Sequence, residues 1–276
     1  LPFILTSPHS GTKFPKGFLK NHNLNVSKKK LLMVSDLYVD ELIKNIKPLD
    51  LIKITSQYSR AYIDLNRDVN EIDYTTLIEK PKSYKNFFVS GYTKNGYGLV
   101  HTNTNDHKTI YKNKLSFSEI QQRISNIYEP WHHNLKNKLE YLKKNNDQIH
   151  LIDFHSMPSD VFSNNYYEKK DIILSDQFGK SSDSRHTTIL KGLFEEQGFS
   201  VGRNIPYQGG YIIKNYGKLD NRVHAIQIEI RRDLYMDEKL LIKNGNFTKF
   251  RDKLNIVIEN YINNFMIGAE LGYAAQ

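Results

Sequence analysis

The chain of 276 residues contains no cysteine, so it cannot form a disulfide and offers no thiolate to a metal ion. It also lacks any apolar run near the ~18 residues that a membrane-spanning helix needs, and its mean hydropathy is −0.58. A chain of this length buries about three quarters of its surface without covalent crosslinks. We therefore expect a soluble globular protein of one or two domains.

Arginine is scarce, although the chain is basic. Of 39 cationic residues only 9 are Arg, and the formal net charge is +9. The Lys excess is typical of a compositional bias that gives a diffuse basic surface, which we favour over a groove for a polyanion. Bidentate geometry is one reason for a site to use Arg. Five of the nine lie in or beside the motifs described below: Arg60, Arg67, Arg203, Arg231 and Arg232.

The sequence begins at Leu1 rather than at Met, already inside an apolar run, so we interpret it as a fragment or a trimmed chain. Removal of a leader before Leu1 stays open. The expected cytoplasmic location depends only on the absence of cysteine.

Short apolar strands alternate with helical segments along the chain. Strands are expected at 2–6, 49–56, 61–65, 149–154, 171–174 and 223–230, and helices at 28–47, 116–145 with a kink at Pro130, 185–197 and 255–266. This alternation predicts an α/β fold with helices on both faces of the sheet. Residues 67–115 show no clear period and are expected to form a long loop at the entrance of a site. No linker divides the chain, so we predict a single domain over residues 1–276.

Polar clusters follow the predicted strands, where ligands bind in open α/β sheets. Their sequences are SPHSG at 7–11, DLNR at 64–67, DFHS at 153–156 and QIEIR at 227–231. His9 and His155 each follow or end an apolar strand, and each is followed by Ser. Asp153 precedes His155 by two residues, hence on the same strand face, and could orient the imidazole. We expect the two histidines to share a metal ion, although a structural histidine at each position remains an alternative.

A hydrolytic metal site needs a third protein ligand and an open position for water. In the predicted helix at 28–47, Asp36 lies at the edge of the apolar stripe and Asp40 is turned further toward the lysines. We favour Asp36 as the ligand and keep Asp40 as the alternative. His132 and His133 are adjacent in a helix and cannot bind one metal together, so one of them is expected at the surface.

Glu229 lies in an apolar strand, where an ionised carboxylate is costly unless it is paired or used as a base. A structural ion pair and a role as general base both remain alternatives. Asn66 and Arg67 could clamp a substrate carboxylate. Gly209 and Gly210 allow close backbone approach to a ligand beside the aromatic Tyr211, although a plain glycine turn is the commoner reading.

Taken in order, these clusters resemble the N-formylglutamate amidohydrolase (deformylase) family. The resembling segments are SPHSG at 7–11, SD at 35–36, YSRAYIDLNRD at 58–68, EPWHHNL at 129–135, LIDFHSMPSD at 151–160, NIPYQGGYIIKNYG at 204–217 and HAIQIEIRRDLYMDE at 224–238. The resemblance covers nearly the whole chain. It implies a fold like that of zinc carboxypeptidases (phosphorylase/hydrolase-like), with a mixed, mostly parallel central sheet. It also implies hydrolysis of N-formyl-L-glutamate to formate and L-glutamate, in histidine degradation.

The resemblance also implies roles for individual residues. His9 and His155 are the implied zinc ligands, with Asp36 as the third. Carboxypeptidases carry the acidic ligand three residues after the first histidine, where this chain has Thr12, which cannot serve as that ligand. Glu229 matches the catalytic glutamate. The implied substrate-binding residues are Asn66 and Arg67 for the carboxylate, with Asn204, Gly210 and Tyr211 from the segment at 204–217.

The expected chemistry is metal-assisted amide hydrolysis, with Glu229 as the base and Arg60 or Arg67 stabilising the oxyanion. Two histidines and a carboxylate can also bind Mn, Co or Fe, so these ligand types do not specify zinc as the metal. A related hydrolase for another N-acyl amino acid or a small peptide is the nearest alternative. A basic nucleic-acid-binding module is a distant one, and we expect neither a nucleic acid nor a membrane as partner. The sequence does not indicate the oligomeric state.

Overall fold

The computed structural model describes residues 1–48, 51–163 and 166–270. The chain forms two compact units. The first, here called the sheet unit, comprises Leu1–Ser7, Tyr38–Ile54 and Leu142–Gln276. The second, the loop unit, comprises Pro8–Leu37 and Thr55–Tyr141. The chain passes repeatedly between them, so neither unit is one continuous stretch of sequence.

A six-stranded sheet organises the first unit, in the order β2-β1-β3-β6-β4-β5. Its strands are β1 (Phe3–Ser7), β2 (Ile52–Thr55), β3 (Ile149–Met157), β4 (Ile172–Ser175), β5 (Val201–Arg203) and β6 (Val223–Arg231). Strand β3 runs parallel to both β1 and β6, while β4 is antiparallel to β6 and parallel to β5. The predicted mixed, mostly parallel sheet is therefore confirmed. All nine residues of β3 are buried, including its polar residues, as expected of a strand covered on both faces.

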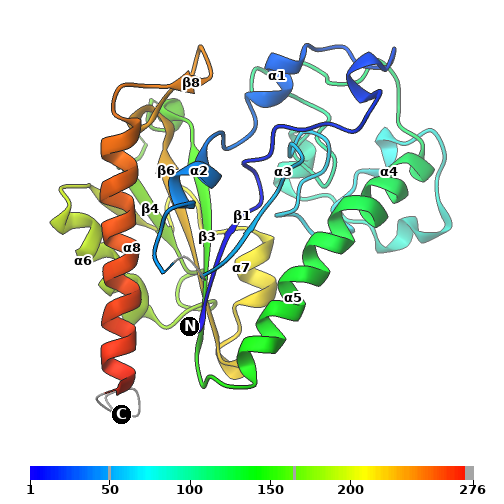
Figure 1. The fold of residues 1–276 in the computed structure, drawn as a ribbon. Coiled ribbons are helices and arrows are strands. Elements are labelled where there is room, and N and C mark those ends of the chain that lie inside the picture. The colour runs from blue at the N-terminus through cyan, green and yellow to red at the C-terminus, as the bar shows by residue number, and fades with distance from the viewer. Residues whose placement is uncertain (49–50, 164–165, 271–276) are drawn as a thin grey trace. The chain divides into compact units, whose positions relative to one another are not determined.

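Helices pack against this sheet from two sides. They are α2 (Val39–Ile43), α6 (Ser184–Glu196), α7 (Tyr211–Tyr216) and α8 (Phe247–Glu270). In Figure 1, α6 and α8 lie on one side of the sheet and α7 lies on the other. Helix α6 begins after the N-cap Asp183 and is followed by Gly198 at a φ of 83°, close to the predicted limits. A short hairpin, β7 (Met236–Asp237) and β8 (Ile242–Lys243), precedes α8.

The loop unit has little regular structure apart from one long helical run. Its elements are η1 (Phe18–Lys20), α1 (Lys28–Leu32), η2 (Tyr74–Thr76), η3 (Lys82–Asn86), α3 (Gly91–Lys94), α4 (Phe117–Arg123), the π-helical η4 (Ile124–Tyr128) and α5 (Glu129–Lys143), whose end belongs to the sheet unit. The expectation of a long loop over 67–115 is confirmed apart from three short helices. The π turn comes directly before Pro130, and its wider ring relieves the clash that proline causes in a regular helix.

Two predicted elements are wrong. The helix expected over 28–47 is broken into α1 and α2, because Tyr38 has a φ of 68° and the N–H of Asp36 donates to the carbonyl of His9. The strand expected over 61–65 is a series of turns. Its apolar residues are buried as the alternation requires, but the N–H of Asp64 donates to Leu99, outside any ladder. The strand predicted over 49–56 is observed over 52–55; residues 49 and 50 lie outside the described residues.

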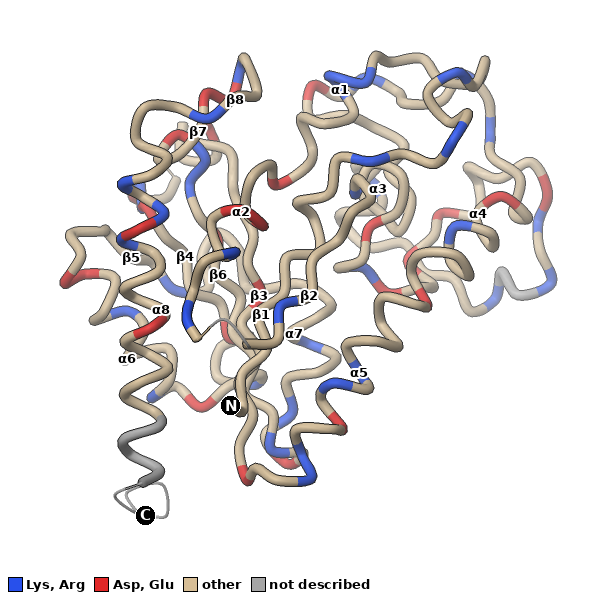
Figure 2. The backbone as a smooth tube through the Cα atoms, viewed as in Figure 1, with Lys and Arg blue, Asp and Glu red and all other residues tan. Residues whose placement is uncertain are grey.

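Lysine and arginine are distributed over helices and loops of both units (Figure 2). This distribution fits the interpretation of the net charge as a diffuse background. Among the described residues, no helix is long and apolar enough to cross a membrane.

Candidate metal centre and catalytic site

The predicted site residues divide equally between the two units. His9, Asp36, Arg60, Asn66 and Arg67 belong to the loop unit, and His155, Asn204, Gly210, Tyr211 and Glu229 to the sheet unit.

His9 and Asp36 lie together in the loop unit, and both are buried. The backbone joins them, since the N–H of Asp36 donates to the carbonyl of His9 over 2.9 Å. Their side chains meet at 3.4 Å between His9 Nδ1 and Asp36 Oδ2. Gly11 allows this tight path, because a Cβ there would lie 2.3 Å from the carbonyl oxygen of Tyr58. Asp40, the alternative ligand, lies on α2 in the sheet unit, where burial raises its pKa.

The second ring nitrogen of His9, Nε2, is held by Asp64. Its Oδ1 lies 2.6 Å from His9 Nε2 and also accepts the backbone N–H of Asn66. Its Oδ2 accepts two bonds from Arg60 and lies 3.0 Å from His101 Nε2. An ionised carboxylate only accepts hydrogen bonds, so the facing Nε2 atoms of both histidines carry hydrogen. When Nε2 carries the only ring hydrogen, the Nδ1 atom of His9 has the lone pair that a metal ligand requires.

Asp64 is ionised although it is fully buried. Burial alone would raise the pKa of this carboxyl, but the charge of Arg60, followed by His9, Arg67 and the bond from His101, lowers the pKa well below its usual range. Burial lowers the pKa of His101 to about 4, which keeps this imidazole neutral near pH 7. The arrangement is thus one carboxylate charge balanced chiefly by Arg60.

Arg67 is nine-tenths buried and lies against the long loop. Its Nε donates to the carbonyl of Tyr97, and its guanidinium lies 4.3 Å from the centroid of the Tyr92 ring. The Tyr128 hydroxyl donates to the carbonyl of Arg67, and His132 Nε2 donates to the carbonyl of Leu65. The long helical run therefore holds the DLNR turn from behind. His133 is exposed, as expected for one of the adjacent pair.

In the sheet unit, His155 projects from β3 with a carboxylate on its ring. Its Nε2 lies 2.8 Å from Asp153 Oδ2, so the contact predicted from their two-residue spacing is confirmed. Asp153 Oδ1 accepts a bond from the Thr6 hydroxyl of β1, its register partner on the neighbouring strand. The sheet thereby fixes the carboxylate, and the carboxylate orients the imidazole.

Glu229 is the register partner of His155 on the neighbouring strand β6. Its side chain is 6% exposed. Gln227, two residues earlier on the same face, donates from Nε2 to Glu229 Oε1 over 2.7 Å. The Oε1 atom of Gln227 accepts the backbone N–H of Gly210 over 2.8 Å. A buried carboxylate held by an amide, on the strand beside a candidate ligand, has the surroundings expected of a base.

Asn204 and Tyr211 lie on either side of Gly210 in the chain. The buried Asn204 has a φ of 59°, and its side chain bonds to Asp176 through both Nδ2 and Oδ1. These bonds shape the loop after β4, so substrate binding by Asn204 stays a prediction. Tyr211 begins α7 and is partly buried.

His9 and Asp36 of the loop unit and His155 of the sheet unit, all buried, are candidate ligands of a metal ion. The donor set fits a divalent cation, since it supplies two imidazoles and one carboxylate and each imidazole has a carboxylate on its Nε2. Two ligand atoms of a tetrahedral zinc ion, each about 2.0–2.2 Å from it, lie about 3.3–3.5 Å apart. The observed 3.4 Å between His9 Nδ1 and Asp36 Oδ2 fits that spacing.

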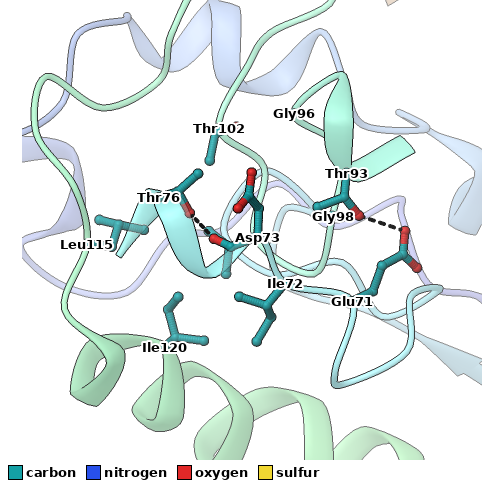
Figure 3. A pocket seen from close by; sticks show the side chains of 11 residues that line it. Glu71, Ile72, Asp73, Thr76, Thr93, Gly96, Gly98, Thr102, Leu115 and Ile120 are labelled. Atoms are coloured by element: carbon teal, nitrogen blue, oxygen red, sulfur yellow. Dashed lines mark hydrogen bonds between the residues drawn. The ribbon is translucent and has the colours of Figure 1, made fainter. Parts of the chain in front are cut away.

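A small cavity lies inside the loop unit, lined by residues of the 67–115 segment and by Ile120 of α4 (Figure 3). Its volume of about 20 Å³ suits one water molecule rather than an amino acid. Glu71 lines it and accepts bonds from the Ser90 and Thr93 hydroxyls. This cavity is a feature of loop packing and not a substrate pocket.

Sequence reasoning missed His101 and Gln227. His101 lies in a segment without periodicity, so nothing linked it to Asp64. Gln227 was visible as part of the QIEIR motif, two residues before Glu229 on the same strand face.

Comparison with a family model, with individual protein sequences and with a solved structure gives the same family. The model of the N-formylglutamate amidohydrolase family matches residues 1–236. N-formylglutamate deformylase of Pseudomonas putida is 25% identical over 241 residues, which cover 86% of this chain and 83% of the relative. The deformylase of Pseudomonas aeruginosa is also 25% identical, over 87% of this chain and 84% of the relative.

Two solved structures share the fold. The crystal structure of N-formylglutamate amidohydrolase from Ralstonia eutropha JMP134 superimposes with a TM-score of 0.90 at 28% identity, covering 97% of this chain and 95% of that one. A gene product from Agrobacterium tumefaciens superimposes with a TM-score of 0.67 at 18% identity, covering 96% of this chain and 92% of that one. The second likeness concerns the fold alone.

Proposed function

The chain belongs to the N-formylglutamate amidohydrolase family, and we propose that it hydrolyses the formyl amide of N-formyl-L-glutamate to formate and L-glutamate. Water adds to the formyl carbon, the C–N bond breaks, and the glutamate nitrogen takes a proton. The observation that carries this proposal is the register of β3 and β6, which pairs His155 with Glu229. A candidate ligand and a candidate base thus project from adjacent strands.

We propose that His9, Asp36 and His155 bind one zinc ion. A bound zinc supplies Lewis-acid polarisation of the formyl carbonyl and lowers the pKa of a bound water. Asp64 and Asp153 hold the two imidazoles through their Nε2 atoms, leaving both Nδ1 atoms as the donors. The support is the chemistry of this donor set and the spacing of His9 and Asp36.

Glu229 is the proposed general base. It takes a proton from the attacking water and passes it to the departing amine nitrogen. Arg60 is the proposed counter-charge for the oxyanion, and its two bonds to Asp64 hold the guanidinium in one orientation. Asn66, Arg67, Asn204, Gly210 and Tyr211 are the proposed substrate-binding residues, with Arg67 facing a substrate carboxylate.

Replacing the base tests this mechanism. We expect Glu229→Gln to retain its metal and to lose about 10²- to 10⁴-fold in kcat on N-formylglutamate, because the amide cannot accept the water proton. Elemental analysis measures the metal, and formate release measures turnover. Glu195→Gln, on the exposed face of α6, is the matched control. Full turnover by metal-loaded Glu229→Gln would show that another group is the base.

The nearest competing function is hydrolysis of another N-acyl amino acid or a small peptide by the same site. A panel of N-formyl, N-acetyl and N-succinyl amino acids separates the two. We expect the highest kcat/KM with N-formylglutamate, and a clear preference for another acyl group or side chain would replace this substrate.

We also propose that residues 1–276 form a single domain and that the protein is cytoplasmic. The family match spans residues of both units, which supports one catalytic domain. Cell fractionation tests the location.

A further inference from the structure

Gln227 occupies a buried position in the middle of the sheet. It lies on β6, with Asp153 of β3 as its register partner on one side and Ser175 of β4 on the other. Its side chain is 4% exposed and makes bonds in two directions, to the carboxylate of Glu229 and to the backbone of Gly210. Burial of a primary amide in such a place is costly unless it is hydrogen-bonded, and here both ends are used.

The chemistry of Gly210 fixes the orientation of this amide. A backbone N–H can only donate, so the atom of Gln227 that faces Gly210 must be the carbonyl oxygen. The NH₂ group is therefore directed to Glu229, 2.7 Å away. Because NH₂ only donates, Glu229 Oε1 must accept, and it does so best as an unprotonated oxygen.

Gly210 in turn is a firm anchor. The turn that precedes it is tied to the loop after β4 by Gln177, whose Nε2 donates to the carbonyls of Gln208 and Gly209. The Ser175 hydroxyl donates to the carbonyl of Tyr207 over 2.7 Å. Gly209 has a φ of 100°, a conformation that favours glycine. The bond from Gly210 to Gln227 therefore starts from a backbone that is held at several points.

We propose that Gln227 is a positioning residue for the general base, tying Glu229 Oε1 to the backbone of Gly210 and directing proton uptake to Glu229 Oε2. The amide holds Oε1 as an acceptor throughout the reaction. The proton taken from water is then carried on Oε2, from which it is passed to the amine. This inference rests on the proposed role of Glu229 and adds the element that orients it.

The test is the variant Gln227→Met, which keeps the side-chain length but makes neither bond. We expect kcat to fall about 10- to 100-fold, because a misplaced base loses part of its 10²- to 10⁴-fold contribution. KM should change less than about threefold, because the bonds from Gln177 and Ser175 still hold the turn before Gly210. The metal content should stay the same, since Gln227 is not a ligand in the proposal. Thermal melting reports folding. If Gln227→Met does not fold, Gln227→Asn, which keeps the amide but is too short to make both bonds, replaces it with the same expectation.

The effect must operate through Glu229, which a double-mutant cycle measures. In the Glu229→Gln background, Gln227→Met should change the residual kcat less than about threefold. An equal loss in both backgrounds, or an unchanged kcat in the wild-type background, overturns the inference and leaves the proposed function standing. Full turnover by Glu229→Gln itself overturns both.

Ser175→Ala is the matched control. It removes a buried bond to the same turn, at the register position beside Gln227, without touching Glu229. We expect it to act equally in both backgrounds. Dependence of its effect on Glu229 would show that loosening of the turn, rather than the Gln227 bond, governs the base, and would overturn the inference.

Discussion

At the scale of single residues, the same device appears in both units. Asp64 contacts Nε2 of His9, and Asp153 contacts Nε2 of His155. Each carboxylate is itself held by other donors, Asp64 by Arg60 and Asp153 by Thr6. A carboxylate on the far nitrogen sets the tautomer and raises the basicity of the nitrogen that binds a metal.

This device gives a prediction for Asp153→Asn. We expect the variant to fold and to bind zinc about 10- to 100-fold more weakly, because the amide no longer holds the His155 ring by a charge-assisted bond. Competition with a chromogenic chelator measures the affinity. Asp183→Asn, at the N-cap of α6, makes the same chemical change and should leave it unaltered. Equal affinity in wild type and Asp153→Asn would contradict the role of Asp153.

The two carboxylates differ in how far the sequence predicts them. Asp153 is two residues from His155 in a clear strand, so the strand period is enough to pair them. Asp64 is 55 residues from His9, in a turn that the sequence pattern predicts to be a strand, and only folding brings them together.

At the scale of elements, α4 is pinned to the loop unit by a buried cation. The Arg123 side chain is fully buried, donates to the carbonyl of Tyr62 and the hydroxyl of Tyr111, and pairs with Glu119 one helical turn earlier. Its guanidinium lies 4.2 Å from the centroid of the Tyr62 ring. Apolar packing around Phe18 completes this cluster.

We therefore expect Arg123→Met to lower the free energy of unfolding by about 2–4 kcal/mol. Methionine fills much of the volume, but the buried oxygens of Tyr62 and Tyr111 lose their donor. Urea denaturation measures the change. Arg251→Met, which removes a surface pair with Asp252 on α8, should cost less than about 1 kcal/mol. Similar losses in the two variants would show that Arg123 does not act as a buried anchor.

Elements were predicted well where burial is continuous and poorly where local contacts compete. The apolar runs of β1, β3 and β6 are unmistakable because both faces of these strands are covered. The segment 28–47 has a helical apolar pattern throughout, yet the bond from Asp36 to His9 and the conformation of Tyr38 interrupt it. The sequence pattern carries no record of that long-range bond.

At the scale of the whole molecule, we expect three histidines to make the free energy of unfolding depend on pH. His150, His186 and His224 pack together in the sheet unit, with ring centroids 4.5–5.5 Å apart. Burial lowers the pKa of all three, that of His186 to about 4. The neighbouring polar groups are the Tyr261 hydroxyl on His150 and the Asp183 backbone N–H on His224. The charges of Asp183 and Arg185, at the N-terminus of α6, act on His186 and His224.

The sign follows from proton binding. Below the unfolded pKa of about 6.5, the histidines bind protons in the unfolded chain but remain neutral in the folded cluster. The stability that they contribute is therefore fully present above that pH and falls toward pH 4. Each proton contributes at most about 1.4 kcal/mol per pH unit in this window. We expect the urea midpoint to fall between pH 6.5 and 4.5, and the slope to be shallower in His186→Phe, which keeps an aromatic ring.

The exposed His133, replaced by Gln, controls for the loss of a histidine as such. An identical slope in wild type and His186→Phe would remove the cluster as the cause.

By itself the sequence determined the α/β class, the central strands and the residue types of the site, because hydrophobic period and polar residues at strand ends are local properties. Only the tertiary structure decided which partners those residues have. Asp36 contacts His9 from a connection rather than from a helix face, Asp64 holds His9 across 55 residues, and Gln227 joins Glu229 to Gly210. Apart from the bond between Gln227 and Glu229 on one strand face, these contacts join segments that are distant in the chain, which no periodicity in the sequence encodes.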